Sequence, residues 1–482
     1  MSATKTQPKS KGTTGLEKKT QNMKLEGAAA KPAQPSLPKV KSKNLDVPKL
    51  WADGAGSRKP SAAFVVIGHV DHGKSTLMGR LLLDTGAVAQ RDIDKFRKQA
   101  EEIGKSSFAL AWVMDMAADE RERGVTVDIA QHHFSTDKAD LTILDAPGHR
   151  DFVPNMIGGA NMADLGVLVV DANQLDSGLK GQTREHVLLA RAIGLKRMIV
   201  AVNKMDGTTP AWDQEAFMSV KDQVEKLLKE TGFEAQDVAL VPCSGLKGNN
   251  VVKPPSASGE EAWVTTKSQT LISALEDLAG TTSIPDEPIT KPFRMQITDT
   301  FRGSIQNPVS VSGRISSGNV QVGDVLVVQP SSEQAIVKSI EIANDGCDYA
   351  VAGQIASLHL DGDAETLERN VQTGATVCSS QQPVKIVSGI TAVVTAAETL
   401  LPSTVSLHIG RLHAPARIAG LLELVSGKGE VAKKKPRVVL PGQRVRVAIK
   451  MDEGVPVEAG ERIVLRSNSA TVASGVVERV EA

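Results

Sequence analysis

A glycine-rich segment that ends in a lysine and a hydroxyl residue carries the strongest chemical signal in the sequence. Gly68, Gly73, Lys74 and Ser75 match the pattern G-x-x-x-x-G-K-[ST], with an apolar run before it and a helical pattern after it. In this context, loop N–H groups and the N-terminus of the following helix bind phosphate. Lys74 would reach the β- and γ-phosphates of a nucleoside triphosphate, and the Ser75 hydroxyl would bind Mg²⁺. The predicted nucleotide contacts here are His69, Val70, Asp71, His72, Gly73, Lys74, Ser75 and Thr76.

A second motif, Asn203-Lys204-Met205-Asp206, selects the base. It follows an apolar run at 198–202 that predicts a buried strand. A carboxylate at Asp206 can accept two hydrogen bonds from N1–H and the N2 amino group of guanine. Adenine has no such donor pair and would leave the buried charge unpaired. Asn203 would brace the loop, and Lys204 would lie over the base. The backbone of a short segment after a later strand could contact guanine O6, and its residues are Ser244, Gly245 and Leu246.

Two further segments predict a magnesium site and a switch that senses the γ-phosphate. Asp145 and Gly148 belong to Asp-Ala-Pro-Gly after the predicted strand 141–144. Asp145 could hold Mg²⁺ through water, and the Gly148 N–H could reach the γ-phosphate. Thr126 lies between the glycine-rich loop and Asp145, where a threonine can bind Mg²⁺ and sense the γ-phosphate. Loss of that phosphate would release the segment.

His149 directly follows this glycine and is predicted to orient the attacking water. A lone histidine is more often structural, but this position favours the catalytic interpretation. Val70 and Val125 could form an apolar gate that holds His149 away until an activator acts. Asp71 is also predicted among the catalytic residues, with Thr126. No arginine stands out as a built-in finger, so we expect slow intrinsic hydrolysis and an external activator worth ~10³–10⁵-fold.

These residues must be positioned by an α/β domain followed by two barrels. From Ser61 to about Leu278, apolar strands alternate with helical stretches, which predicts a mostly parallel sheet with helices on both faces. After Ser283, short alternating runs predict two antiparallel β-barrels. The predicted parts are a disordered lysine-rich tail at 1–50, a GTP-binding domain at 51–283, and barrels at 284–380 and 381–482. Predicted strands are 62–67, 141–144, 165–170, 198–202, 238–241, 293–297, 308–314, 324–328, 335–342, 389–394, 405–409, 438–440, 444–449 and 461–465, and predicted helices are 74–83, 182–192 and 212–230.

Composition excludes several classes of protein. The formal net charge is +0, so nucleic acid contact must be local, and DNA binding is not expected. The 3 cysteines are far apart, form no metal-ligand spacing, and suit a reducing compartment. No apolar run approaches the ~20 residues of a membrane helix. The N-terminus has neither an apolar signal core nor an arginine before Arg58, so we expect a cytoplasmic protein.

Taken together, these motifs resemble the translational GTPases. Val311–Ile315 resembles the signature of the family's first barrel, and Arg462–Arg466 resembles part of its last. Within the family, the chain is most similar to the elongation factor 1-alpha branch, and 61–67, 106–115 and 433–437 look most like its Hbs-type ribosome-rescue members. His72 and Ile463 depart from the branch pattern, which has a small residue and an aromatic there. The segments that match the family are 68–76, 120–128, 145–157, 181–186 and 203–206.

The resemblance implies GTP/GDP and Mg²⁺ as ligands, the ribosome and the tRNA-mimicking factor Pelota as partners, and a chain that is otherwise monomeric. Stalled ribosomes would be the target, and GTP hydrolysis would release the GTPase. Delivery of a termination factor or aminoacyl-tRNA remains an alternative, as do the GTPase subunit of sulfate activation and a scaffold with a vestigial site. The basic run 433–437 with Arg444 and Arg446 could face rRNA phosphates or be a solvated loop and barrel exterior.

Overall fold

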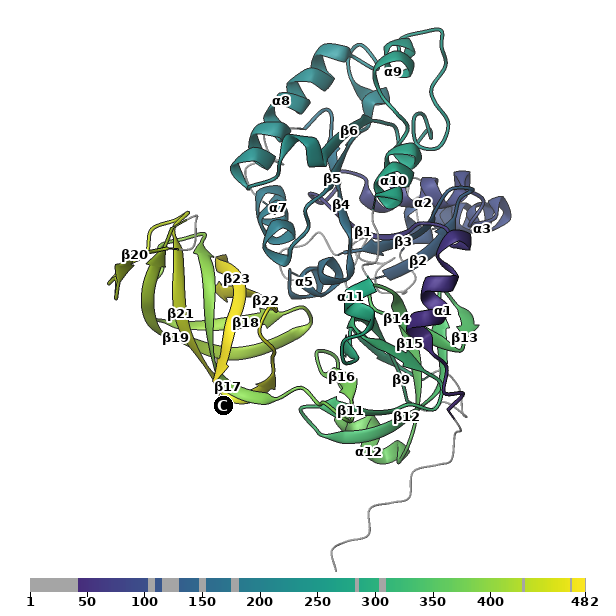
Figure 1. Ribbon diagram of the computed structural model, residues 1–482. Helices are drawn as coiled ribbons and strands as arrows, with labels where there is room; N and C mark the ends of the chain where they lie inside the picture. Colours follow the sequence, from purple (N-terminus) through teal and green to yellow (C-terminus); the bar gives the residue numbers. More distant parts are fainter. Residues whose placement is uncertain are drawn as a thin grey trace, which may run out of the picture. The chain divides into compact units, whose positions relative to one another are not determined.

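A six-stranded sheet organises the first domain of the computed structural model (Figure 1). The structure describes residues 42–102, 109–114, 130–146, 153–174, 182–281, 286–302, 309–426, 430–468 and 470–481. The strand order is β2-β3-β1-β4-β5-β6, and β2 is antiparallel to β3 whereas the neighbouring pairs from β3 to β6 are parallel. The strands are β1 (Ser61–Ile67), β2 (Ala130–Ser135), β3 (Asp140–Asp145), β4 (Leu165–Asp171), β5 (Met198–Asn203) and β6 (Val238–Pro242).

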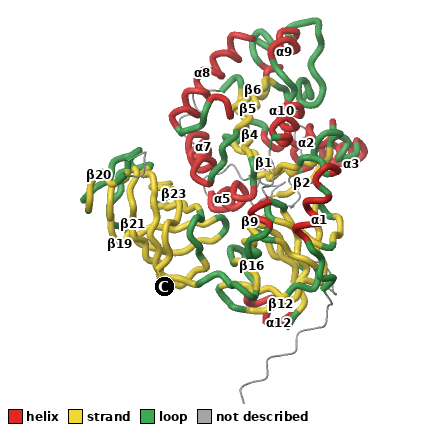
Figure 2. The backbone as a smooth tube through the Cα atoms, in the orientation of Figure 1, coloured by secondary structure: helices red, strands yellow, loops and turns green. Residues whose placement is uncertain are grey.

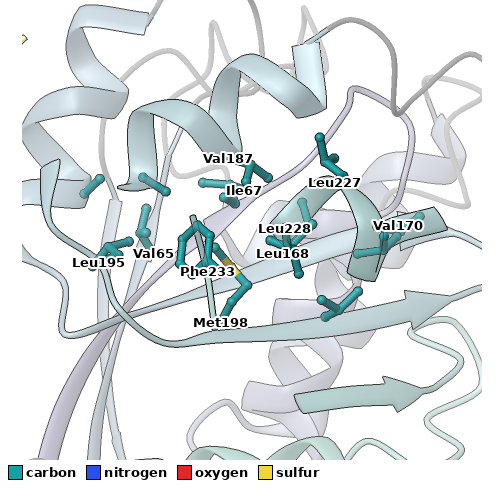
Figure 3. Close-up of a cluster of buried hydrophobic side chains, with 14 of the residues drawn as sticks. Val65, Ile67, Leu168, Val170, Val187, Leu195, Met198, Leu227, Leu228 and Phe233 are labelled. Atoms are coloured by element: carbon teal, nitrogen blue, oxygen red, sulfur yellow. The ribbon is translucent and has the colours of Figure 1, made fainter. Parts of the chain in front are cut away.

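Helices cover both faces of this sheet, as the alternating sequence pattern predicts. Ala63, Val65 and Ile67 of β1 belong to a cluster with side chains of α5, α7 and α8. Figure 3 labels Val65 and Ile67 of this cluster, together with Val187 of α7 and Leu228 of α8. Phe64 and Val66 point to the other face and join a cluster with α2, α3 and α10. A strand buried on both faces needs an unbroken apolar run, which β1 supplies. The helices are α2 (Lys74–Asp84), α3 (Gln90–Glu102), α5 (Val153–Met162), α7 (Gln182–Ile193), α8 (Gln214–Glu230), α9 (Ala262–Lys267) and α10 (Leu271–Gly280).

Helix α8 begins two residues later than the predicted start at Trp212. The reason is a side-chain cap: Asp213 accepts hydrogen bonds from the N–H groups of Glu215, at 3.0 Å, and Ala216, at 3.3 Å. Trp212 has φ +59°, which a helical residue cannot adopt. An aspartate N-cap satisfies N–H groups that the first helical turn leaves unpaired, so the cap decides where the helix starts.

The first barrel closes through pairing of β11 with β12 at the two ends of the order β11-β16-β7-β9-β15-β12. Figure 2 shows strands dominating this part of the chain, in contrast to the helices around the first sheet. The elements are β7 (Arg294–Gln296), β8 (Asp299–Phe301), β9 (Val309–Ser317), β10 (Asn319–Gln321), β11 (Val325–Gln329), β12 (Glu333–Ile342), β13 (Asp345–Cys347), β14 (Tyr349–Val351), β15 (Ile355–Asp361), β16 (Thr376–Ser379), α11 (Asp286–Ile289) and α12 (Ala364–Asn370).

The second barrel closes through β18 and β19, at the ends of the order β18-β22-β23-β17-β21-β19. The predicted strand at 438–440 is wrong, because only an isolated bridge joins Val439 to Leu400 there. The 14-residue strand β19 was not predicted, since Pro415 and Gly420 argue against a strand interior. Register shifts beside Gly420 accommodate the irregularity. The strands are β17 (Ile386–Ala396), β18 (Thr404–Ile409), β19 (Leu412–Val425), β20 (Val431–Lys434), β21 (Arg444–Pro456), β22 (Arg462–Ser467) and β23 (Ala470–Glu481).

The end of the predicted tail is ordered and packs on the first barrel. Residues 1–41 lie outside the described residues, but 42–50 are described, and helix α1 (Val47–Asp53) crosses the predicted boundary at residue 50. Val47 is 1% exposed and belongs to the barrel core. The Leu45 N–H donates to Gln321 Oε1 at 2.8 Å, and Gln321 Nε2 donates back to the Leu45 carbonyl at 3.4 Å. Val47, the partly buried Leu45 and one reciprocal pair of hydrogen bonds therefore anchor a segment that its composition predicts to be disordered.

Val47→Ala is expected to lower the free energy of unfolding by about 1–2 kcal/mol, because it removes two buried methyl groups from the barrel core. Lys43→Ala is the matched control: its ion pair with Asp348 joins side chains that are 55% and 54% exposed, so its loss should change stability little. Urea denaturation followed by circular dichroism measures both. Equal effects of the two changes would contradict anchoring through Val47.

Candidate functional site

The loop between β1 and α2 has a backbone that only glycine can follow at two positions. Gly68 has φ +144°, and a Cβ there would lie 2.4 Å from the Val169 carbonyl oxygen. Gly73 has φ +86°, and a Cβ would lie 2.7 Å from Asn203 Nδ2. Both glycines therefore allow the loop to fold tightly against β4 and β5. The glycine-rich motif of the sequence therefore forms a compact loop at the carboxyl end of β1.

Lys74 is the first residue of α2, and its side chain turns back over the loop. Its Nζ donates to the carbonyl oxygens of Gly68, at 3.1 Å, and His69, at 3.0 Å. Ser75 and Thr76 occupy the same first helical turn. A helix N-terminus with an ammonium group and hydroxyls beside it can bind a phosphate anion. The arrangement therefore fits the phosphate chain of a nucleotide.

Asn203 ties three segments together at the end of β5. Its Nδ2 donates to the His72 carbonyl at 2.9 Å, and its Oδ1 accepts from the Gly245 N–H at 2.8 Å. Asn203 is buried, so both bonds are shielded from water. This geometry fits the bracing role predicted for Asn203, because its side-chain amide bonds both the phosphate loop and the segment 244–246.

Asp206 lies close to the 244–246 segment but keeps its carboxylate partly accessible. The Asp206 side chain is 14% exposed, and the Lys247 Nζ lies 3.5 Å from Oδ2. Ser244 is fully buried, and its Oγ accepts from the Lys247 N–H at 3.1 Å. Leu246 is 58% exposed. A partly accessible carboxylate beside this backbone segment can recognise a base edge that carries two donors, which fits guanine.

Several predicted residues lie outside the described part of the chain: Thr126, Gly148, His149 and Val125 of the proposed gate. Asp145 is described; it ends β3 and is fully buried, opposite Val66 of β1 in the strand register. The described residues contain no group of three or more His, Cys, Asp or Glu side chains able to hold a metal. Among the described residues, Ser75 and Asp145 would offer oxygen atoms to a magnesium ion bound with a nucleotide, and Mg²⁺ prefers such hard oxygen ligands.

Comparison with known proteins identifies the family. Residues 59–281 match the elongation factor Tu GTP binding domain, and 404–481 match the elongation factor Tu C-terminal domain. Elongation factor 1-alpha of Picrophilus torridus is 38% identical over 432 residues, covering 87% of this chain and 98% of that protein. The chain is a translational GTPase of the elongation factor 1-alpha branch.

Two further relatives extend this comparison. Protein HBS1 of Drosophila melanogaster is 35% identical over 451 residues, which is 90% of this GTPase and 65% of that protein. The GTP-bound structure of the Ski7 GTPase-like domain from S. cerevisiae has a TM-score of 0.70 at 19% identity, covering 88% of this chain and 98% of that domain. The Ski7 likeness supports the fold alone.

Two residues near the phosphate loop of this GTPase were given no role by sequence reasoning. His186 of α7 is buried, and burial together with the charges of Lys74 and His69 lowers its pKa to about 3. Asp171, at the end of β4, accepts from Lys204 Nζ at 2.8 Å. His186 ends the family-like segment 181–186, to which the sequence analysis assigned no nucleotide contact, and Asp171 belongs to none of the matching segments. For Asp171 the available signal was a carboxylate at the end of a buried strand, as at Asp145.

His72 is a buried histidine of the loop, and burial is the main reason that its pKa falls from 6.5 to about 4. Its Nδ1 lies 3.2 Å from the Val169 carbonyl oxygen. The unfolded chain would take up a proton on this side chain near pH 6.5, whereas the folded chain would do so only near pH 4. The contribution of neutral His72 to the free energy of unfolding should therefore be fully present above pH 6.5. It should be lost as the pH drops from 6.5 to about 4.

His72→Ala is expected to reduce the loss of stability between pH 7.5 and pH 5 by about 2 kcal/mol, because the residue that titrates differently in the two states is gone. Urea denaturation of both proteins at the two pH values gives the difference. Other titrating groups contribute equally to both proteins and cancel. An identical pH dependence in the variant would show that His72 is not a buried neutral residue.

The basic run of the second barrel is only partly available to a partner. Residues 433–435, Arg437 and Arg444 are exposed. Arg446 is engaged within the barrel: it forms two hydrogen bonds with Glu478, at 2.6 and 2.8 Å, and a short one with Glu423. A phosphate-binding role for Arg446 would require breaking this network. The exposed residues 433–435, Arg437 and Arg444 could still contact rRNA phosphates, which stays a prediction.

None of the described helices is both long and apolar enough to cross a membrane.

Proposed function

We propose that this GTPase delivers a tRNA-mimicking factor of the Pelota type to stalled ribosomes, where GTP hydrolysis releases the GTPase so that the ribosome can be rescued. The similarity to protein HBS1 over 90% of the chain carries the proposal. Such a protein would act in no-go and non-stop mRNA surveillance in the cytoplasm. The chain would be monomeric apart from this partner.

The site supports a division of labour among its residues. Lys74 and the loop N–H groups hold the β- and γ-phosphates, and Asp206 accepts from guanine N1–H and its amino group. Lys204 covers the base, and the 244–246 backbone faces O6. Ser75, Thr126 and Asp145 would hold Mg²⁺, which would supply positive charge beside the phosphates. The hydrogen bonds of Asn203 support the roles of the phosphate and base segments, because that side chain joins the two segments.

Hydrolysis is assigned to His149, which would orient a water molecule toward the γ-phosphate, with Thr126 and Asp71 beside it. Asp71 is exposed, and the bond that it accepts from Lys204, at 2.6 Å, goes to its backbone carbonyl and does not occupy its carboxylate. Val70 and Val125 would separate His149 from the phosphate until the ribosome acts. Activation by the ribosome would then add ~10³–10⁵-fold to a slow intrinsic rate.

Delivery of aminoacyl-tRNA is the second candidate, because elongation factor 1-alpha of P. torridus is matched over 98% of its length. Two assays with the full chain and a non-hydrolysable GTP analogue separate the candidates. Calorimetry should show GTP-dependent binding of a Pelota-type protein. The ester of aminoacyl-tRNA should hydrolyse at its free rate in the presence of the chain. Protection of that ester, without binding of the Pelota-type protein, would favour tRNA delivery.

A further inference from the structure

Asp171 is a buried carboxylate at the carboxyl end of β4 that none of the nucleotide-binding motifs contains. Its side chain is 3% exposed. Oδ2 lies 2.8 Å from Lys204 Nζ, and Oδ1 accepts from the N–H and the Nδ2 of Asn173, at 2.9 and 3.2 Å. Both carboxylate oxygens are therefore used. Burial alone would raise the pKa of Asp171, but the bonds from Lys204 and Asn173 outweigh it, so the net shift is downward.

Lys204 is held at three points by this arrangement. Its Nζ reaches the Asp71 carbonyl of the phosphate loop, at 2.6 Å, as well as Asp171. Its own carbonyl accepts from Asn173 Nδ2 at 3.2 Å. Its backbone has φ +62°, a conformation that few non-glycine residues adopt without local support. The Lys204 side chain is nonetheless 40% exposed, so part of it remains accessible to a ligand although its Nζ is engaged.

The position of Asp171 is set by the sheet and not by a flexible loop. Asp171 pairs with Asn203 in the parallel register of β4 and β5, and the Ala172 N–H donates to the Asn203 carbonyl at 2.9 Å. The carboxylate therefore sits on the strand next to the one that leads into Lys204. A charge on a rigid strand end restricts a long side chain that would otherwise sample many rotamers.

We infer that Asp171 is a positioning residue for the guanine base, acting through Lys204. Its carboxylate stretches the lysine between β4 and the phosphate loop, so that the alkyl stem forms a preset shelf on which the base can lie. The inference rests on the proposed binding of guanine nucleotides at this site. Asp171 itself would not touch the nucleotide, because both of its oxygens are already bonded inside the protein.

Presetting the shelf raises affinity because binding no longer has to order the lysine. Asp171→Asn keeps the shape of the side chain and removes its charge. This variant should weaken binding of GDP and GTP about tenfold, mainly through faster dissociation. A shelf that supports any purine ring does not choose between bases, so the ratio of GTP to ITP affinity should stay unchanged.

A double-mutant cycle tests whether the effect passes through Lys204. Dissociation constants for GDP are measured by calorimetry for the wild type, Asp171→Asn, Lys204→Met and the double variant. We expect the Asp171 change to weaken binding about tenfold when Lys204 is present but less than about twofold in the Lys204→Met background, since no ammonium remains there to be held. Asp222→Asn, on an exposed position of α8, is the charge-matched control and should bind as the wild type does.

Two outcomes would overturn the inference. Equal losses of GDP affinity with and without Lys204 would mean that Asp171 acts on the fold. An unchanged GDP affinity in Asp171→Asn would mean that Asp171 does not affect nucleotide binding. If Asp171→Asn does not fold, Asn173→Ala, which removes one bond to each of Asp171 and Lys204, should still weaken GDP binding about threefold. A wild-type chain that binds no guanine nucleotide would instead overturn the proposed function, and the inference with it.

Discussion

His149→Ala is expected to lower ribosome-stimulated GTP hydrolysis by about 10³–10⁵-fold, to the slow intrinsic rate. The physical reason is that the side chain would orient a water molecule and would not bind the nucleotide. GTP affinity should therefore stay within about twofold of the wild type, because binding relies on other residues. Single-turnover hydrolysis with ribosomes at saturating GTP, together with calorimetry for affinity, measures the two quantities separately.

His413→Ala is the matched control, since His413 is exposed on the second barrel and should leave hydrolysis unchanged. His149→Gln should recover part of the rate, because an amide can also accept a hydrogen bond from water. Ribosome-stimulated turnover that survives in His149→Ala would show that the catalytic assignment is wrong. A parallel loss of GTP affinity would instead point to a structural role.

Asp206→Asn is expected to weaken GTP binding by about 10³-fold and to favour xanthine nucleotides. The carboxylate accepts from two guanine donors, and an amide in its place can accept only one of these bonds and turns its own N–H toward the other donor. Xanthine has a carbonyl oxygen where guanine has the amino group, so the amide N–H gains an acceptor. Competition of GDP and XDP against a fluorescent nucleotide measures the change in preference.

Asp222→Asn serves as the control here as well, because it makes the same chemical change far from the base. An Asp206→Asn variant that still prefers GDP over XDP, with affinity within about threefold of the wild type, would show that base recognition does not depend on Asp206.

The nucleotide motifs could be read from the sequence because each is a short loop between a buried strand and the element that follows. Gly68, Gly73 and Lys74 are close in sequence. A loop this tight needs glycine at the two positive-φ positions, whatever the arrangement of the other domains. Asn203 and Asp206 after β5 are likewise close in sequence. Such local constraints survive without tertiary information, and the structure describes both loops at the carboxyl edge of one sheet.

Contacts between distant segments could not be read in this way. Asp171 meets Lys204, and His186 approaches Lys74, only because β4, β5 and α7 pack side by side. Neither pair has a spacing that marks it. The packed end of the predicted tail is similar: its lysine-rich composition predicts disorder, yet Val47 fits into the barrel core. A single well-placed apolar residue carries little weight in a composition average.

The sequence by itself determined the order of the domains, the alternation of strands and helices in the first of them, and the residue types of the phosphate and base loops. These follow from hydrophobic periodicity and local backbone geometry, which neighbouring residues decide. Only the tertiary structure decided which side chains support those loops, how far β19 extends, and which arginine of the basic run is engaged. Those outcomes depend on register shifts and ion pairs between elements, and such interactions exist only once the strands and helices have packed.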